Sequence, residues 1–244
     1  MKGERLDVVL VDLGLAESRE KAQRLIRAGK VRLEDKILDK PGHRVAMDAA
    51  LQVEDAQRFV SRGGEKLDAA MEGFKLDVGG RICVDIGAST GGFTDCLLQR
   101  GAAKVYAVDV GKGQLHWRLR QDSRVVVMEG ENARFLTRSM FAEAPEFGVV
   151  DASFISLTLL LPAVVSVMAA GSRLVTLIKP QFEAGRELVG KGGVVRDPVV
   201  HQQVIDRIRE FGRVELSLGW LGVLESPIRG PAGNVEFLAA WELA

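Results

Sequence analysis

The chain has 244 residues, 47% of them hydrophobic and 27% charged, an ordinary globular composition with enough apolar material for a sizeable core. The formal net charge is zero, so a nucleic-acid interface would have to come from local charge. The two cysteines, Cys83 and Cys96, lack the spacing of a disulfide framework or a metal site, and no apolar signal-peptide core follows the first residues. We therefore expect a cytoplasmic protein.

The first sixty residues contain short helices followed by short strands. Apolar residues recur at helical spacing from Leu6 to Leu13, and Ser18 can cap a second helix that ends at Gly29. Short strands are predicted at 31–33, 37–38 and 51–53. From Ser18 to Arg44 there are nine basic and four acidic residues, and the basic ones step along one side of the second helix. Such a run is either a solvated helix face or a phosphate-binding patch, and composition alone leaves both open.

After residue 80 the pattern becomes alternating strands and helices. Short apolar runs predict buried strands at 82–86, 105–110, 125–128, 149–151 and 174–178, with helices at 93–99, 157–169 and 197–211 and two last strands at 214–218 and 235–240. This alternation predicts a doubly wound, mostly parallel α/β sheet. The uncharged run 152–172 contains several serines and a proline, so we interpret it as a loop and a helix packed on the sheet, and we expect no membrane contact.

A glycine-rich turn follows the first strand of this pattern, in the segment from Asp85 to Phe93, and the second strand ends in Asp109. A carboxylate there can accept hydrogen bonds from both ribose hydroxyls of a nucleoside cofactor. The spacing Gly87-x-x-x-Gly91-Gly92 departs from the dinucleotide pattern, which favours S-adenosylmethionine over NAD. An acid near the loop suits the ammonium group of that cofactor.

Four charged residues stand in unusual places: Lys66 after a Ser-Arg-Gly-Gly-Glu segment, Asp151 and Lys179 at strand ends, and Glu236 inside an apolar strand. Because the functional crevice of an open α/β sheet lies beyond the carboxyl ends of its strands, Asp151 and Lys179 should face the glycine-rich turn. Charged residues in such sequence are seldom buried without a partner. Two lysines and two acids around one crevice favour a catalytic role.

These motifs resemble the FtsJ-type RNA 2′-O-methyltransferases, with their Lys-Asp-Lys-Glu tetrad, and the segment from Arg5 to Val53 is similar to an S4 RNA-binding domain. The order and length of the two resemble the TlyA family. The resemblance implies an S4 domain at 1–58, a linker at 59–66 and, at 67–244, a Rossmann-like class I methyltransferase sheet whose last strand is antiparallel. It implies methylation of cytidine 2′-hydroxyls in ribosomal RNA within ribosomal subunits. Phe93 stands where FtsJ-type proteins often have tryptophan.

The expected site residues follow from these motifs. The catalytic set is Lys66, Asp151, Lys179 and Glu236. Cofactor contacts are expected from Asp85, Gly87, Ser89, Thr90, Gly91, Gly92, Phe93, Asp109, Asn132 and Asp151. RNA contacts are expected from Arg5, Arg19, Lys21, Arg24, Arg27 and Arg62.

The expected chemistry is an in-line displacement at a sulfonium methyl group, which is already activated, so no metal is expected. The protein must place a ribose hydroxyl and remove its proton. A lysine amine can accept that proton only when it is neutral, which burial or a nearby cation favours. We expect Lys179 to be the base, Lys66 the nearby cation, and Asp151 and Glu236 to hold the lysines.

Two glycine-rich segments remain open. The segment from Arg62 to Gly64 is either an ordinary linker or a hinge that couples RNA binding to the active site, and Gly190–Gly193 is predicted to be a mobile loop near the substrate. Three other functions remain as alternatives: an S4-bearing pseudouridine synthase, a non-catalytic RNA-binding or ribosome-assembly factor, and a haemolysin.

Overall fold

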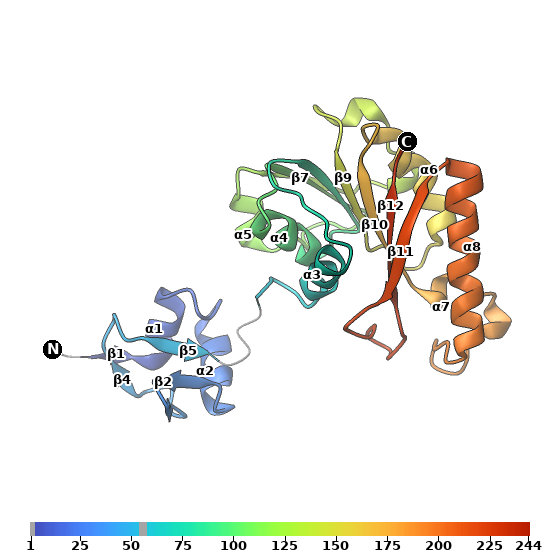
Figure 1. The fold of residues 1–244 in the computed structure, drawn as a ribbon. Coiled ribbons are helices and arrows are strands. Elements are labelled where there is room, and N and C mark those ends of the chain that lie inside the picture. The colour runs from blue at the N-terminus through green and yellow to red at the C-terminus, as the bar shows by residue number, and fades with distance from the viewer. Residues whose placement is uncertain (1–2, 54–57) are drawn as a thin grey trace. The chain divides into compact units, whose positions relative to one another are not determined.

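The computed structural model describes residues 3–53 and 58–244, and the chain divides into two compact units, Met1–Arg58 and Phe59–Ala244 (Figure 1). Within these described residues, no helix has the length and apolar character needed to cross a membrane. The uncharged run is a loop followed by helix α6 (Leu157–Val167), as predicted.

The first unit is a small α+β fold. Its core is formed by apolar residues such as Leu6, Leu10, Ile26 and Val31, each fully buried. Helix α2 begins where the sequence predicts, since the Ser18 hydroxyl accepts a hydrogen bond from the Lys21 amide at 3.2 Å. The elements are β1 (Glu4–Arg5), α1 (Leu6–Asp12), α2 (Arg19–Arg27), β2 (Val31–Leu33), β3 (Lys36–Ile37), β4 (Arg44–Val45) and β5 (Leu51–Val53), with β1 paired to β4 and β2 between β3 and β5.

The second unit is built on a seven-stranded sheet in the order β11-β12-β10-β9-β6-β7-β8. Five strands are parallel, and β12 runs antiparallel to both of its neighbours, which confirms the predicted class I methyltransferase sheet. The strands are β6 (Ile82–Ile86), β7 (Lys104–Asp109), β8 (Val125–Glu129), β9 (Phe147–Val150), β10 (Arg173–Ile178), β11 (Gly219–Glu225) and β12 (Phe237–Glu242).

Helices cover both faces of this sheet. Apolar residues of α3 (Gly63–Gly73) and α4 (Gly92–Gln99) pack in one core cluster with one sheet face, and those of α6 and α8 (Pro198–Leu216) pack in a second cluster with the other face. The remaining helices are α5 (Trp117–Gln121) and α7 (Pro180–Glu183), with 3₁₀ turns at Ala133–Phe135, Arg138–Met140 and Arg186–Leu188.

One predicted strand is wrong. Residues 214–218 were expected to form a strand, but α8 continues to Leu216, Ser217 ends it in the left-handed conformation at φ 54°, and the strand begins only at Gly219. The alternating apolar residues of this segment fit either structure, and a short apolar run does not distinguish them. The helix is selected because its earlier turns already pack on the sheet.

Residues 59–66, expected as a linker, pack with the second unit. Phe59 is buried in its core, and Gly63 to Lys66 form the first turn of α3. Gly64 has a packing reason to be glycine, since a Cβ there would lie 2.2 Å from the Phe59 ring. A hinge at Arg62–Gly64 stays a prediction.

Candidate functional site

The glycine-rich turn joins β6 to α4 at the point where the sheet order reverses, because β7 lies on one side of β6 and β9 on the other. Crevices at such switch points are the usual ligand sites of open α/β sheets. Gly87 has φ 83°, and a Cβ on it would lie 2.6 Å from the Asp151 carbonyl oxygen. Only glycine therefore allows the turn to approach the end of β9 this closely.

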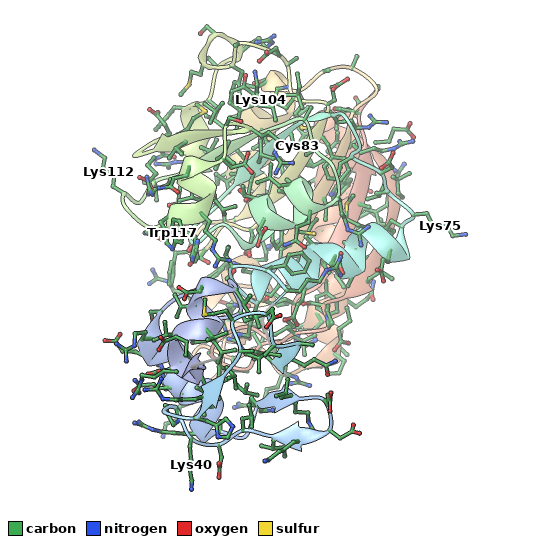
Figure 2. The ribbon with its side chains drawn as sticks, turned by 90° about the vertical axis from the view of Figure 1, so that its left-hand side faces the viewer. Lys40, Lys75, Cys83, Lys104, Lys112 and Trp117 are labelled. Carbon is green, nitrogen blue, oxygen red and sulfur yellow. The ribbon has the colours of Figure 1, made fainter. Side chains whose placement is uncertain are left out.

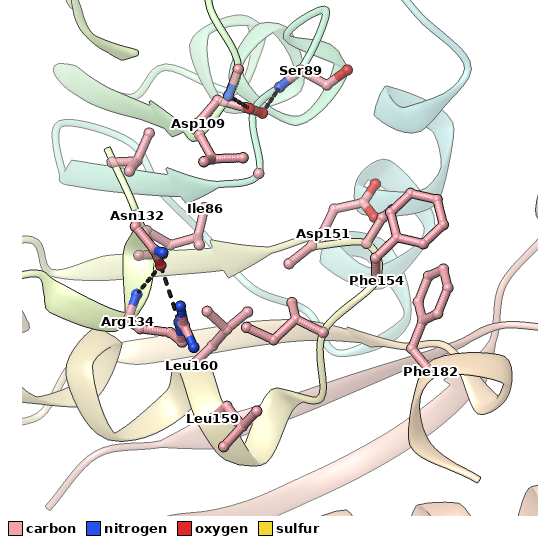
Figure 3. Close-up of a pocket in the computed structure, with 18 of the residues that line it drawn as sticks. Ile86, Ser89, Asp109, Asn132, Arg134, Asp151, Phe154, Leu159, Leu160 and Phe182 are labelled. Atoms are coloured by element: carbon pink, nitrogen blue, oxygen red, sulfur yellow. Dashed lines mark hydrogen bonds between the residues drawn. The ribbon is translucent and has the colours of Figure 1, made fainter. Parts of the chain in front are cut away.

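Asp109, at the end of β7, fixes the turn from the other side. Its carboxylate accepts hydrogen bonds from the Ser89 amide at 2.8 Å and the Gly111 amide at 2.7 Å (Figure 3). Each carboxylate oxygen keeps a lone pair for a further donor. The predicted role as an acceptor for ribose hydroxyls is thus compatible with its position.

A cavity of about 1170 Å³ opens between the turn, the ends of β7 and β9 and helix α6 (Figure 3). This volume leaves ample room for a nucleoside that carries an amino-acid group. Apolar side chains of Ile86, Val108 and Leu160 line one part, while the predicted cofactor residues in its lining are Gly87, Ser89, Asp109, Asn132 and Asp151. The close glycine turn, the strand-end carboxylate and the mixed lining together fit S-adenosylmethionine.

A second cavity of about 300 Å³ adjoins the first, and the two share Gly87, Ser89, Asp151 and Ser153 in their linings. All four predicted catalytic residues line it, as do Arg62 and the predicted cofactor residues Thr90, Gly92 and Phe93. The structure therefore brings the tetrad and the glycine-rich turn to the same side of the sheet. This is the arrangement on which a methyl-transfer role depends.

The tetrad consists of two lysine–carboxylate pairs. Lys66 Nζ, from α3, donates to Glu236 Oε2 at 2.6 Å, and Lys179 Nζ, at the end of β10, lies 2.6 Å from Asp151 Oδ1. Lys179 also donates to Ser153 Oγ at 2.9 Å. Glu236 is 1% exposed and Lys179 is 7% exposed, so each charge is compensated by a partner in a largely dry site.

Glu183, which lies in the segment after Lys179, forms hydrogen bonds with the end of the loop that contains Asp151. Its carboxylate accepts from Ser156 Oγ and from the Leu157 amide, both at 2.7 Å, at the start of α6. Arg207 of α8 lies 3.4 Å from the same carboxylate. Burial raises the pKa of Glu183 above its usual value. Because α7 follows Lys179 directly, this contact helps to hold Lys179 and Asp151 together.

Two predicted cofactor residues, Asp85 and Gly91, line neither cavity. Asp85 is fully buried and accepts a hydrogen bond from Thr94 Oγ1 at 2.7 Å, so its carboxylate lies behind the turn. Gly91, at φ 99°, lies against α5, where a Cβ would be 2.2 Å from Leu119. Both residues shape the turn from inside the protein.

Asp85 predicts a pH dependence of stability. Burial raises its pKa to about 7, above the value of about 3.9 that it has in an unfolded chain, so the folded protein binds this proton more tightly. The folded state is therefore destabilised as pH rises from about 4 through about 7. We predict that the thermal unfolding midpoint of the wild type falls by several degrees more between about pH 5 and about pH 8 than that of Asp85→Asn.

The control for this measurement is Asp77→Asn, because Asp77 is exposed on the surface. Its pH dependence should equal that of the wild type. If Asp85→Asn also matches the wild type, the pKa of Asp85 is not raised in the folded protein.

Sequence reasoning missed four residues around the cavities. Ser153 binds the amine of Lys179, Arg229 lines the smaller cavity, and Phe154 and Phe182 form an aromatic pair with ring centroids 5.0 Å apart at the larger one. Phe154 has φ 63° and is 89% exposed (Figure 3). Phe154 could have been found from its position, because it stands three residues after the strand-end Asp151 in a predicted loop. A large aromatic side chain in a loop is seldom left exposed to water without a function.

In the first unit, two of the predicted RNA-binding arginines converge on one buried acid. Asp7 is 0% exposed, and its carboxylate accepts from Arg5 Nε at 2.9 Å and from Arg19 Nη2 at 3.1 Å. The hydrogen bond from Arg5 is the main reason that the pKa of Asp7 lies well below its usual value. Arg24 and Arg27 are exposed and Lys21 is half-buried on α2, so the unit presents a basic helix face.

Comparison with known proteins assigns a family to each of the two units. The FtsJ-like methyltransferase family matches residues 59–243, and the S4 domain matches residues 4–50. The chain is 49% identical to the 16S/23S rRNA (cytidine-2′-O)-methyltransferase TlyA of Mycobacterium tuberculosis, covering 96% of this chain and 87% of that protein. It is 43% identical to Hemolysin A of Brachyspira hyodysenteriae, over 96% and 98% of the two chains. A solved structure from Streptococcus thermophilus, described as a hemolysin, superposes with a TM-score of 0.76 at 46% identity, covering 100% of this chain and 90% of that chain.

Proposed function

The chain belongs to the FtsJ-like methyltransferases and, with its S4 domain, to the TlyA family, and from this membership we propose that it methylates the 2′-hydroxyl of cytidine in ribosomal RNA, using S-adenosylmethionine. The S4 domain indicates that the binding partner of this protein is RNA. We further propose that the RNA is presented in ribosomal subunits in the cytoplasm. One observation carries the proposal: Lys179 and Asp151 form an ion pair at the boundary that the two cavities share.

The larger cavity is the proposed cofactor site. Asp109 and Asn132 would hold the ribose and base end, and the turn at Gly87 to Ser89 would hold the methionine end. When bound, S-adenosylmethionine supplies a methyl group on a positively charged sulfur, so the electrophile needs no further activation. The work left to the protein is to exclude water and to place the attacking oxygen.

The smaller cavity is the proposed site of the target ribose. Acting from its neutral form, the Lys179 amine accepts the proton of the 2′-hydroxyl and orients that oxygen, and the ammonium so formed is the partner of Asp151 and Ser153 at the cavity wall. Lys66, fixed by Glu236, supplies positive charge that stabilises the developing alkoxide. The proton is thus moved by a side chain already positioned before RNA binds.

The aromatic pair at Phe154 and Phe182 is the proposed site of the target base. An exposed aromatic ring in a loop is a stacking surface for an unpaired base, and a base must leave its stack before its ribose can enter a cavity. The Lys179 amine lies 5.9 Å from the Phe182 ring centroid, so a base stacked here has its own ribose near the lysine.

The basic helix of the first unit is the proposed docking surface for RNA phosphates, with Arg5 and Arg19 held in place by Asp7. We predict that replacing Arg19 and Arg24 together with alanine weakens RNA binding and reduces the slope of log affinity against log salt by about 2, because each phosphate contact contributes about one unit. Filter binding at several salt concentrations measures this slope. The affinity for S-adenosylmethionine should not change.

Arg209→Ala is the matched control, since Arg209 is a half-buried arginine of α8 whose guanidinium pairs with Asp206. It should leave the salt slope as it is. An unchanged slope in the double variant would exclude the α2 face as a phosphate site.

The decisive experiment on function is mass-spectrometric mapping of ribose methylation in ribosomal subunits, and separately in free ribosomal RNA, incubated with the protein and S-adenosylmethionine. Appearance of a 2′-O-methylcytidine supports the proposal. RNA binding without any methylation would favour the non-catalytic assembly factor, and leakage of liposomes by the pure protein would favour the haemolysin.

A further inference from the structure

Trp117 is a large aromatic residue left on the surface of the second unit (Figure 2). The chain has three tryptophans. Trp241 is fully buried and Trp220 is half-buried against it, whereas Trp117 is 54% exposed at the first position of α5. A tryptophan in water forgoes the free energy of burying a large apolar surface, so its exposure calls for a partner outside the unit.

One cationic side chain and one further aromatic ring lie beside the Trp117 ring. The Arg118 guanidinium lies 5.6 Å from the Trp117 ring centroid, and the His116 ring stacks with Trp117 at a centroid distance of 5.9 Å and an interplanar angle of 29°. Within the described residues, Arg118 makes no ion pair with a carboxylate. The segment from residue 111 to residue 124 holds four basic residues and one acidic residue. An aromatic face beside an uncompensated arginine is a site for a base and its phosphate.

The segment that carries Trp117 is joined to the wall of the smaller cavity by a backbone hydrogen bond. The His116 amide donates to the Thr90 carbonyl at 3.0 Å, and Thr90 lines that cavity. Leu115 and Leu119 pack so closely on the turn that a Cβ on Gly91 would lie within 2.8 Å of both. Trp117 is therefore held at a fixed position relative to the proposed site of the target ribose.

The loop that leads into α5 is rigid as well. The Glu129 carboxylate, at the end of β8, accepts from the amides of Gly113 and Gln114 at 2.9 and 3.2 Å, and it also binds Arg120. A stacking surface that is ordered before binding loses little entropy when a ligand arrives.

We propose that Trp117 and Arg118 bind an unpaired nucleotide of the substrate RNA close to the target nucleotide, with Trp117 stacking on the base and Arg118 contacting the phosphate. This inference rests on the proposed RNA methylation. Tryptophan and arginine are also frequent in protein–protein interfaces. RNA is favoured because the adjoining cavity is the proposed site of the target ribose and because Arg118, unlike Arg120 and Arg124, has no carboxylate partner among the described residues.

Tryptophan fluorescence tests the stacking directly. Full-length protein is titrated with ribosomal RNA transcribed in vitro, which carries no methyl groups. Stacking on a base should quench the emission of Trp117, so the wild type should show saturable quenching that Trp117→Phe lacks. Trp220→Phe, which removes a tryptophan at the other edge of the sheet, should keep the quenching. Equal quenching in the wild type and Trp117→Phe would overturn the proposal.

Kinetics on the same RNA provide the second test. Trp117→Ala should raise the KM for RNA about tenfold, since one base stacked on an aromatic ring contributes on that order, and should leave kcat and the affinity for S-adenosylmethionine unchanged. Trp117→Phe should restore most of the RNA affinity because a phenyl ring still stacks. Val214→Ala, which shortens an exposed apolar side chain of α8, is the control.

Three outcomes are decisive. A rise in the KM for RNA in Trp117→Ala that is largely absent in Trp117→Phe supports the proposal. A KM unchanged by Trp117→Ala overturns it, and so does a defect confined to intact ribosomal subunits, which would indicate a protein contact. If the wild type methylates neither free ribosomal RNA nor ribosomal subunits, the proposed function fails, while the fluorescence titration still decides the stacking.

Discussion

Replacing Lys179 with alanine is expected to lower the rate of methyl transfer by about 10³-fold or more, because general base catalysis and orientation of the nucleophile are lost together. Lys179 is 7% exposed, and Asp151 and Ser153 hold its amine. Among the residues that the structure describes, Lys66 is the only other lysine that lines the cavity, and it is bound to Glu236. Single-turnover transfer of a labelled methyl group to ribosomal RNA measures the effect, and calorimetry should find the affinity for S-adenosylmethionine unchanged.

Lys179→Arg separates the two roles of the lysine. Arginine keeps the positive charge but does not lose its proton at ordinary pH, so it can pair with Asp151 without acting as a base. We expect this variant to be as inactive as Lys179→Ala. Activity close to that of the wild type would mean that the residue supplies only charge. Lys75→Ala, at an exposed position after α3, should remain fully active.

Replacing Gly87 with valine is expected to weaken S-adenosylmethionine binding by at least about 100-fold, since a β-branched residue at positive φ is strained and its side chain would collide with the backbone of β9. The added Cβ would lie 2.6 Å from the Asp151 carbonyl oxygen and 2.9 Å from its carbon. The turn and Asp151 would have to separate, which opens the boundary between the two cavities. Isothermal titration with S-adenosylmethionine measures the loss.

Gly171→Val is the matched control for this variant. Gly171 has a similar φ of 69°, but a Cβ there would meet nothing within 4 Å. It should reduce stability through backbone strain alone and leave cofactor affinity unchanged. If both valine variants bind S-adenosylmethionine like the wild type, close approach at Gly87 is not needed for the cofactor site.

The sequence by itself determined the fold class and the side of the sheet on which the site lies. Strands of a parallel sheet are buried on both faces, so they are visible as short apolar runs, and their carboxyl ends share one edge. Asp109, Asp151 and Lys179 could therefore be placed together before any coordinates. The end of α8 at Leu216 could not be predicted in this way, since an alternating apolar segment after a helix is compatible with one more turn of that helix.

Only the tertiary structure decided which charges pair and which side chains face the cavities. Lys66 and Glu236 are 170 positions apart, and no local periodicity relates residues at that separation. Asp85 illustrates the same limit on a smaller scale: its place at the strand end was predictable, but its burial against Thr94 depends on how α4 packs on β6. The exposure of Trp117 and Phe154 likewise depends on what the rest of the chain leaves uncovered. Local sequence determines elements and edges, whereas packing between distant elements determines partners, burial and free surface.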